Sequence, residues 1–362
     1  MGIMHRVLRR RVAVWQTEIR LLHRFGGVRP PEAVQWISTA TCDLHCPHCY
    51  SHAGRRGREE LDFDEVARHI IDELVRLGRP RFVIAGGEAL LRPDFARLVR
   101  LLHRRRIPWA LHTHGGRVDR LLDVFRRHPP VMVAISLDGP REVHDAFRGR
   151  AGSFDDALRA MHLLKSVGVP EVIAGTTITR ANADRLVDLV PVVLDSGADA
   201  WGFHLVTPEG RAGGHPELLP TAGQVRRAAA LARRLRAIMR VELDNEWGSA
   251  GAEDAFYRDD PFLCGAGRLS CVIAANGDVM PCTTTDPAER AGNVRTERLA
   301  DLWARGFGAF RTGDDARRAD PHDCWLQTRH GRSCRRAAFL TDVHDDLSLT
   351  GAIVPLTIGA CP

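Results

Sequence analysis

Three cysteines lie within one short stretch of this chain and constrain it more than any other feature. They are Cys42, Cys46 and Cys49, spaced C-x3-C-x2-C after an apolar run. Thiolates this close together can bind three corners of one iron–sulfur cube and leave the fourth iron without a protein ligand. A cluster with an open iron can bind and reduce a ligand. The same stretch could instead bind zinc if His45 or His48 supplied a fourth ligand.

The composition indicates a folded protein with metal or redox chemistry. The chain has 362 residues, 44% of them hydrophobic and 27% charged, which is enough for one large domain or two ordinary ones. No apolar run is long enough to span a membrane. The segment after the basic N-terminus is too short and polar for an export signal, so we expect residues 1–33 to form a short helical extension. Nine cysteines without an export signal favour a reducing, cytoplasmic location over disulfides.

The net charge of +6 does not indicate a nucleic-acid partner. Lys165 is the only lysine, and arginines are spread along the whole chain. They lack the aromatic interleaving of a nucleic-acid groove, so a solvated basic surface is the simpler explanation.

A repeated strand–turn–helix pattern runs from about residue 34 to 240. Alternation of this kind predicts a parallel sheet with helices outside it, and the active sites of such sheets lie at the C-terminal ends of the strands. The three-cysteine stretch follows the first strand and is therefore expected there. The predicted strands are 34–39, 81–85, 107–112, 131–137, 172–178 and 200–206, and the predicted helices are 62–77, 93–103, 119–127, 153–167, 183–196 and 224–239. The first helix begins with a capping box from Asp62 to Glu65.

The second predicted strand ends in Gly86, Gly87 and Glu88, where glycines let the backbone approach a ligand closely. Together with the three cysteines, this pattern resembles the radical SAM superfamily. The resemblance implies an α/β fold, a partial (β/α)6 barrel over residues 34–240. It also implies that these three residues contact the amino group of the methionine part of S-adenosylmethionine (SAM). Ala89 departs from the family, which commonly has proline there.

Five further positions resemble the family's SAM-binding groups. Ser136 and Asp138 end the fourth strand and correspond to ribose contacts, although Asp138 could equally cap a helix. Thr177 ends the fifth strand, where the family often has adenine or carboxylate contacts. Arg211 could pair with the SAM carboxylate or with a substrate acid, and Tyr50 corresponds to a residue beside the adenine.

Two histidines, His112 and His114, end the third predicted strand. Side chains pointing into the barrel mouth could relay protons. A structural hydrogen bond is the commoner role for a histidine, and we adopt it here.

A second group of cysteines follows a predicted linker that begins at residue 241. A turn at residues 276–278 and the spacing of these cysteines resemble a SPASM or Twitch domain, a small α+β domain that binds an auxiliary cluster. Gln327 stands where the full SPASM pattern has a further cysteine. The number of cysteines in this group is therefore enough for one auxiliary [4Fe–4S] cluster. Cys361 could be the remnant of a last ligand, and a structural zinc site would lack the usual C-x2-C pairs. The candidate ligands are Cys264, Cys271, Cys282, Cys324 and Cys334.

The resemblance implies that a reduced flavodoxin or ferredoxin supplies an electron and that SAM is cleaved to methionine and a 5′-deoxyadenosyl radical, which removes a hydrogen atom from the substrate. The auxiliary cluster would accept a second electron. We rank a ribosomally made peptide first as substrate, because that class is the largest. About thirty residues before the first strand are too few for a leader-binding domain, so a peptide substrate would need a separate recognition protein or a groove on the barrel itself. Dehydrogenation of a small molecule, such as an aminoglycoside or a cofactor precursor, is the second reading. A non-catalytic iron–sulfur or zinc protein is a distant third.

Overall fold

A curved sheet with strand order β10-β9-β8-β1-β2-β3-β4-β5-β6-β7 organises the protein. The computed structural model describes residues 27–54, 57, 59–247, 257–258, 264–285 and 287–311. In that part of the chain, neighbouring strands from β1 to β7 are all parallel. The strands are β1 Ala33–Ile37, β2 Arg81–Ala85, β3 Trp109–Thr113, β4 Met132–Ser136, β5 Val172–Ile178, β6 Ala200–Leu205, β7 Arg240–Leu243, β8 Ser270–Ile273, β9 Asp278–Met280 and β10 Gly292–Asn293.

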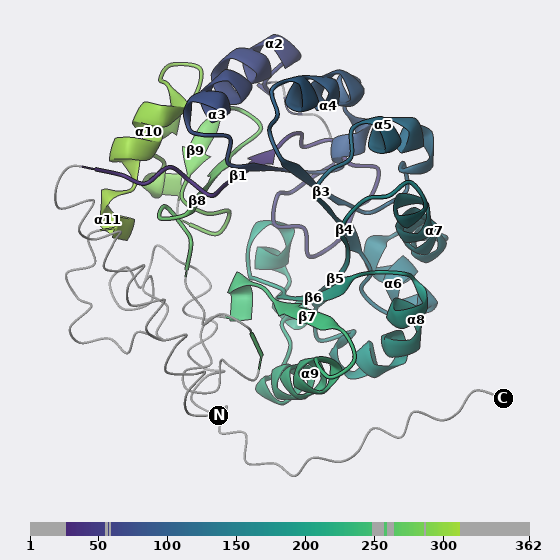
Figure 1. The fold of residues 1–362 in the computed structure, drawn as a ribbon. Coiled ribbons are helices and arrows are strands. Elements are labelled where there is room, and N and C mark those ends of the chain that lie inside the picture. The colour runs from purple at the N-terminus through teal and green to yellow at the C-terminus, as the bar shows by residue number, and fades with distance from the viewer. Residues whose placement is uncertain are drawn as a thin grey trace, which may run out of the picture.

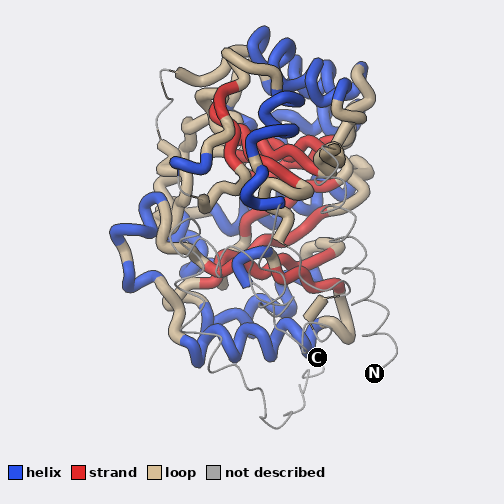
Figure 2. Tube along the Cα trace, turned by 90° about the vertical axis from the view of Figure 1, so that its left-hand side faces the viewer, coloured by secondary structure: helices blue, strands red, loops and turns tan. Residues whose placement is uncertain are grey.

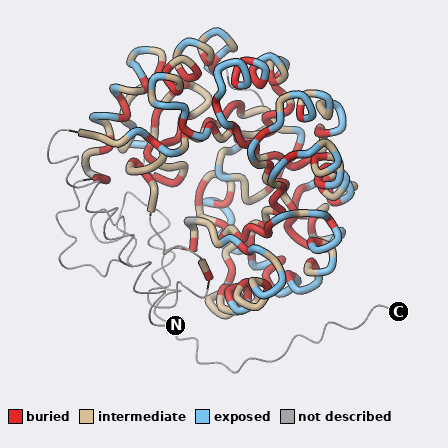
Figure 3. Tube along the Cα trace, in the orientation of Figure 1, coloured by how far each residue is buried: buried red, intermediate tan, exposed pale blue. Residues whose placement is uncertain are grey.

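Helices cover the outer face of this sheet (Figures 1 and 2). Their sides that face the strands are buried and their outer sides are exposed, as Figure 3 shows. In α4, for example, Phe95, Leu98 and Leu102 lie in the core. The helices are α2 Phe63–Glu65, α3 Asp72–Arg76, α4 Phe95–Arg104, α5 Leu122–Arg127, α6 Arg141–Arg148, α7 Ser153–Ser166, α8 Val190–Asp195, α9 Ala222–Leu235, α10 Leu299–Gly306 and α11 Gly308–Arg311.

The predicted order of strands and helices is confirmed. Two further elements, α6 and β7, were not predicted. The capping box from Asp62 to Glu65 is present, and a π-helical turn, Val66–Ile71, joins α2 to α3. The sequence did not predict α6, whose eight residues are mostly polar. It also did not predict β7, a short strand that pairs with β6 and crosses the expected domain boundary at residue 240.

The C-terminal segment continues the barrel sheet. Strand β8 pairs in parallel with β1, on the opposite edge from β7, and then turns back into β9. The predicted turn is present, with Gly277 at a φ of 92° that favours glycine. Side chains add to this attachment, because Arg295 pairs with Glu65 at 2.7 Å and the Trp303 indole donates to the Arg29 carbonyl at 2.8 Å.

Some predictions concern residues outside the described part of the chain. They are the helix expected near the N-terminus, apart from residues 27–33, and the roles of Cys324, Gln327, Cys334 and Cys361. Within the described part, every helix is too short or too polar to cross a bilayer.

Candidate active site

A cavity of about 440 Å³ lies inside the curve of the sheet. Small side chains leave this space, because Ala85, Ala134 and Gly175 occupy positions on the inner face of neighbouring strands. The first three cysteines and the described cysteines of the second group line the cavity, although the two groups lie more than 200 residues apart in the sequence. The lining includes Cys42, Cys46, Cys49, Tyr50, Gly86, Gly87, Ser136, Thr177, Arg211, Cys264, Cys271 and Cys282.

The first three cysteines present their thiols to this cavity from the loop after β1. The Leu44 amide donates to Cys42 Sγ at 3.4 Å, and the Ala53 amide donates to Cys49 Sγ at the same distance. Burial raises the pKa of Cys42 to about 12, and burial also raises the pKa of Cys46. Thiolates at these positions therefore need nearby positive charge, which the irons of a cluster would supply.

The spacing of these side chains does not suit a single zinc ion. Ligands of a tetrahedral zinc, with Zn–S bonds of about 2.3 Å, lie roughly 4 Å from one another. Among the described residues, no three atoms from the three cysteines, His45 and His48 gather within 4.8 Å. His48 instead stacks on Phe147 with ring centroids 4.2 Å apart, and burial lowers its pKa to about 3. The thiols therefore fit an iron–sulfur cube better than a zinc knuckle.

The two glycines after β2 touch the backbone of the cysteine loop. The Gly87 amide donates to the Thr39 carbonyl and the Glu88 amide to the Thr41 carbonyl, both at 2.7 Å. A Cβ atom built on Gly87 would lie 2.2 Å from the Thr41 oxygen. This contact therefore needs glycine, and it places the glycine backbone beside the cysteines.

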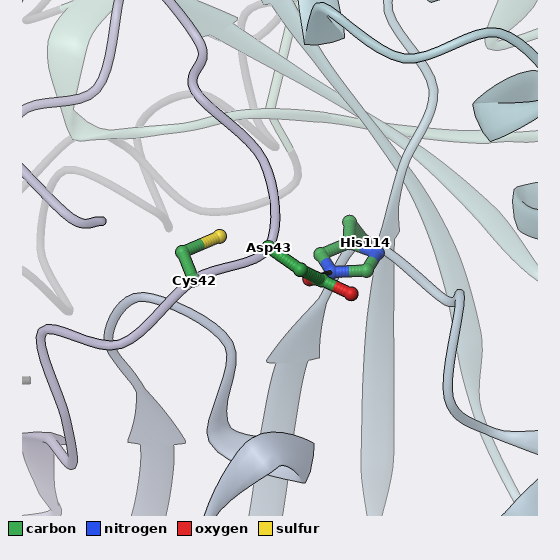
Figure 4. Close-up of side chains that lie close together, drawn as sticks. All are labelled: Cys42, Asp43 and His114. Atoms are coloured by element: carbon green, nitrogen blue, oxygen red, sulfur yellow. Dashed lines mark hydrogen bonds and ion pairs between the residues drawn. The ribbon is translucent and has the colours of Figure 1, made fainter. Parts of the chain in front are cut away.

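Glu88 itself lies behind the cavity wall. Its fully buried carboxylate accepts hydrogen bonds from the Thr113 hydroxyl at 2.8 Å and from the amides of His114 and Leu90. His114 Nε2 lies 3.2 Å from Glu88 and 2.8 Å from Asp43, the residue after Cys42. Figure 4 shows Asp43 between Cys42 and His114.

This contact gives His114 the structural hydrogen-bonding role that the sequence favoured. Burial alone would lower the pKa of His114, but the carboxylates of Glu88 and Asp43 outweigh burial and raise it. The hydrogen bond from His114 in turn lowers the pKa of Asp43. The arrangement holds the start of the cysteine loop against β3.

Asp138 also lies behind the wall, whereas its expected companions Ser136 and Thr177 line the cavity. Its buried carboxylate accepts from Arg148 Nε at 2.6 Å and from the Thr177 amide at 2.9 Å. Arg148 Nη1 lies 3.8 Å from Cys46 Sγ. Asp138 therefore orients an arginine toward a cysteine, and its carboxylate is not on the cavity lining as a ribose contact would require.

Arg211 lines the cavity, but its guanidinium is bonded to the cysteine loop. Nε donates to the Cys46 carbonyl at 2.8 Å and Nη1 to the Ala53 carbonyl at 2.6 Å. The Arg211 amide adds a bond to the Cys49 carbonyl at 3.0 Å. This arginine thus ties the loop after β6 to the cysteine loop.

An ionic group on the cavity wall was not found by sequence analysis. His204 Nδ1 lies 2.9 Å from Asp244 and 3.8 Å from Glu246. Burial would lower the pKa of His204, but the hydrogen bond to Asp244 and the negative charges of Asp244 and Glu246 raise it to about 10. Burial lowers the pKa of His112, on the same wall, to about 4, so His112 is neutral. The inward position of His204 at the end of β6 was the signal available in the sequence.

The described cysteines of the second group differ in their surroundings. Cys271, on β8, is fully buried, and burial raises its pKa to about 12. Cys282 is partly exposed, and its sulfur lies 3.4 Å from the Thr284 hydroxyl. Both line the cavity together with Cys264. Three thiols are thus available for a second cluster on the cavity that the first cysteine loop also lines.

Two protein families match this chain. The radical SAM superfamily matches residues 36–190, and the SPASM iron–sulfur cluster-binding domain matches residues 264–334. These domains imply a SAM-binding [4Fe–4S] cluster and at least one auxiliary [4Fe–4S] cluster.

Similar proteins of known function support the same family assignment. The chain is 34% identical to the mycofactocin maturase MftC of Mycobacterium ulcerans, over 81% of this chain and 79% of the relative. It is 30% identical to the AdoMet-dependent heme synthase of Oleidesulfovibrio alaskensis, over 78% of this chain and 77% of the relative.

Among solved structures, Streptococcus suis SuiB bound to its precursor peptide SuiA has the same fold. Its TM-score is 0.64 at 15% identity, over 80% of this chain and 69% of SuiB. From the family matches and the cysteine-lined cavity at the ends of the parallel strands, we conclude that this chain belongs to the radical SAM superfamily and carries a C-terminal SPASM domain.

Proposed function

We propose that this protein modifies a ribosomally made peptide by radical chemistry, in the reducing cytoplasm. One observation carries the proposal: the two groups of cysteines line a single cavity. Bound there with its cluster, SAM supplies a 5′-deoxyadenosyl radical that removes one hydrogen atom from the substrate. A cavity enclosed by the barrel limits access of water to that radical.

The chain's own residues would divide the work as follows. Cys42, Cys46 and Cys49 bind the SAM-associated cluster. The backbone of Gly86 and Gly87 faces the same space. The SAM contacts that we assign are these two glycines with Tyr50, Ser136 and Thr177, all of which line the cavity.

Three residues first expected to touch SAM receive a different assignment. The carboxylate oxygens of Glu88 and Asp138, and Nε and Nη1 of Arg211, form hydrogen bonds within the protein. We propose that they position the cysteine loop, the strand ends and Arg148, and that none of them needs to contact SAM directly.

The second cluster would take the other electron that an oxidation of the substrate releases. Cys264, Cys271 and Cys282 are its candidate ligands in the described part of the chain, with Cys324 and Cys334 as further candidates. Because Cys271 is fully buried, we expect it to need a metal partner to ionise. A flavodoxin or ferredoxin would reduce the first cluster.

The relatives support a peptide as substrate. Mycofactocin maturases are similar to this chain over most of its length, and the structurally similar SuiB binds a precursor peptide. We expect oxidation, crosslinking or epimerisation of such a peptide, presented by a separate recognition protein.

The heme synthase relatives favour a second candidate, a SAM-dependent oxidation of a small molecule. Their identities of 27% to 30% are somewhat below those of the maturases, and they align over a similar share of the chain.

Anaerobic incubation of the reconstituted protein with SAM and a reductant tests these proposals. We expect 5′-deoxyadenosine, and a mass change on the precursor peptide encoded beside the gene. Cys46→Ala is the control and should give neither product. Cleavage of SAM with an unchanged peptide but an altered iron porphyrin would favour the second candidate. Absence of 5′-deoxyadenosine from material loaded with both clusters would contradict enzymatic function altogether.

A further inference from the structure

A buried charge pair links helix α6 to one cysteine of the first group. Asp138 stands just before α6, and Arg148 is the last residue of that helix. Arg148 Nε donates to Asp138 at 2.6 Å, and Arg148 Nη1 lies 3.8 Å from Cys46 Sγ, within hydrogen-bond range for sulfur. The side chain of Arg148 is 10% exposed and that of Asp138 is fully buried.

Several hydrogen bonds besides the one to Arg148 fix the position of Asp138. Its second carboxylate oxygen accepts from the Thr177 amide, its own amide donates to His144 Nδ1 at 3.0 Å, and its carbonyl accepts from Asn182 at 2.6 Å. Since His144 Nδ1 accepts this bond, the ring is neutral there, and burial lowers its pKa to about 4. The orientation of the guanidinium is therefore determined by β4, β5 and α6 together.

The charges around Cys46 form a dipole whose positive end faces the sulfur. The guanidinium contacts both the carboxylate and the sulfur, so the cation is the charge nearer to the thiol. Arg148 is accordingly the cation in contact with Cys46.

We propose that Arg148, oriented by Asp138, raises the reduction potential of the cluster bound at Cys42, Cys46 and Cys49. Reduction adds one electron and hence one negative charge to the cluster, without making or breaking a bond. A nearby cation and an N–H donor to a ligand sulfur stabilise that added charge, and the low dielectric of a buried site strengthens the effect. Arg148 is thus a positioning and tuning residue, and this proposal does not depend on which substrate is bound.

The test is a reductive titration followed by electron paramagnetic resonance, on the reconstituted full-length protein without SAM. The signal of the first cluster is identified as the one missing from Cys46→Ala. We expect Arg148→Gln to move its midpoint potential to more negative values and Arg148→Lys to move it less. Arg141→Gln is the matched control, because it removes the same charge from the same helix at an exposed position, and it should leave the midpoint unchanged.

Asp138→Asn tests the orientation of the arginine. It keeps an acceptor for the Thr177 amide but turns an amide N–H2 toward Arg148 Nε, so the guanidinium loses the acceptor that orients it and the midpoint should again move to more negative values. An unchanged midpoint in Arg148→Gln, or equal shifts in Arg148→Gln and Arg148→Lys, overturns the proposal, because the retained charge of lysine would then have no effect. If Arg148→Gln does not assemble the cluster, Asp138→Asn decides: a negative shift supports the proposal and an unchanged midpoint refutes it.

Discussion

The two groups of cysteines lie on the same cavity but are held in different ways. The first loop is surrounded by buried ionic side chains and by backbone contacts from β2 and from the loop after β6. The described part of the second group lies on a short hairpin, where Cys282 contacts threonine hydroxyls and Cys271 is enclosed by apolar side chains.

This difference suits different tasks. A cluster that binds SAM must keep one iron open in a fixed position, so its loop needs support from several directions. A cluster that only passes electrons needs to be close and shielded. The polar network around the first loop matches the first of these demands, and the burial of Cys271 matches the second.

Cysteine substitutions should separate the two sites most clearly. We expect Cys46→Ala to reduce formation of 5′-deoxyadenosine to the level of protein-free samples. Cys282→Ala should keep SAM cleavage but lower formation of the modified substrate by about 10- to 100-fold, because a ligand of the second cluster is lost. Both products can be quantified by mass spectrometry in one assay. Equal loss of SAM cleavage in the two variants would show that the sites do not have separate tasks.

A glycine substitution should reveal how tightly the first loop is packed. Gly87→Ala places a Cβ against the Thr41 carbonyl, a backbone group that cannot turn away, so we expect a loss of about 1–3 kcal/mol in the free energy of unfolding. The iron content should fall with it. Gly54→Ala is the matched control, because open space surrounds that position in the same region. Denaturant unfolding and iron analysis of both variants measure the effect; similar values for the two would contradict the tight contact.

The parts of the site that could be predicted from sequence are those whose residues are contiguous. The cysteine spacing and the glycine pair each carry their pattern within a few residues, and the strand before each one places it at the same edge of the sheet. The turn at Gly277 is equally local. Such patterns need no knowledge of tertiary contacts.

The parts that could not be predicted depend on residues brought together by folding. Arg148 lies 102 residues from Cys46, at the end of a short, mostly polar helix that the sequence did not predict. His204 meets Asp244 only because β7 pairs with β6. The inward or buried placement of Glu88 and Asp138 likewise depends on partners from other strands, so the sequence indicated a polar group without showing which way it would turn.

The ionic group on the wall between the two sites should make stability depend on pH. The raised pKa of His204 means that its contribution is complete below the unfolded value of about 6.5 and is lost as the pH rises toward 10. With Asp244 and Glu246 beside it and neutral His112 on the same wall, we expect the free energy of unfolding to fall by about 1–2 kcal/mol between pH 7 and 10, allowing for solvent screening. Urea titrations of His204→Gln should show a flatter profile. His215→Gln, at an exposed histidine paired with Glu217, should keep the profile of the natural protein. If His204→Gln showed the same pH dependence of unfolding as the natural protein, the assignment of that dependence to His204 would be refuted.

The smallest expected effect concerns the junction between the two regions. Arg295, from the segment that carries the second group, pairs with Glu65 at the start of α2, and this hydrogen bond lowers the pKa of Glu65 to about 2. Glu65 also completes the capping box, so a single substitution there mixes two losses. A double-mutant cycle with Arg295→Ala and Glu65→Ala isolates the pair, for which we expect a coupling of about 0.5–1 kcal/mol.

The exposed pair of Arg126 and Asp123 is the control for this cycle, and its coupling should be near zero because both side chains are open to solvent. If the Arg295 cycle also gave zero, the C-terminal segment would depend for its attachment on the pairing of β1 with β8 and on Trp303. The second cluster would then be positioned by the sheet itself. A measurable coupling would instead show that the capping residue of α2 helps to hold the two cysteine groups on one cavity.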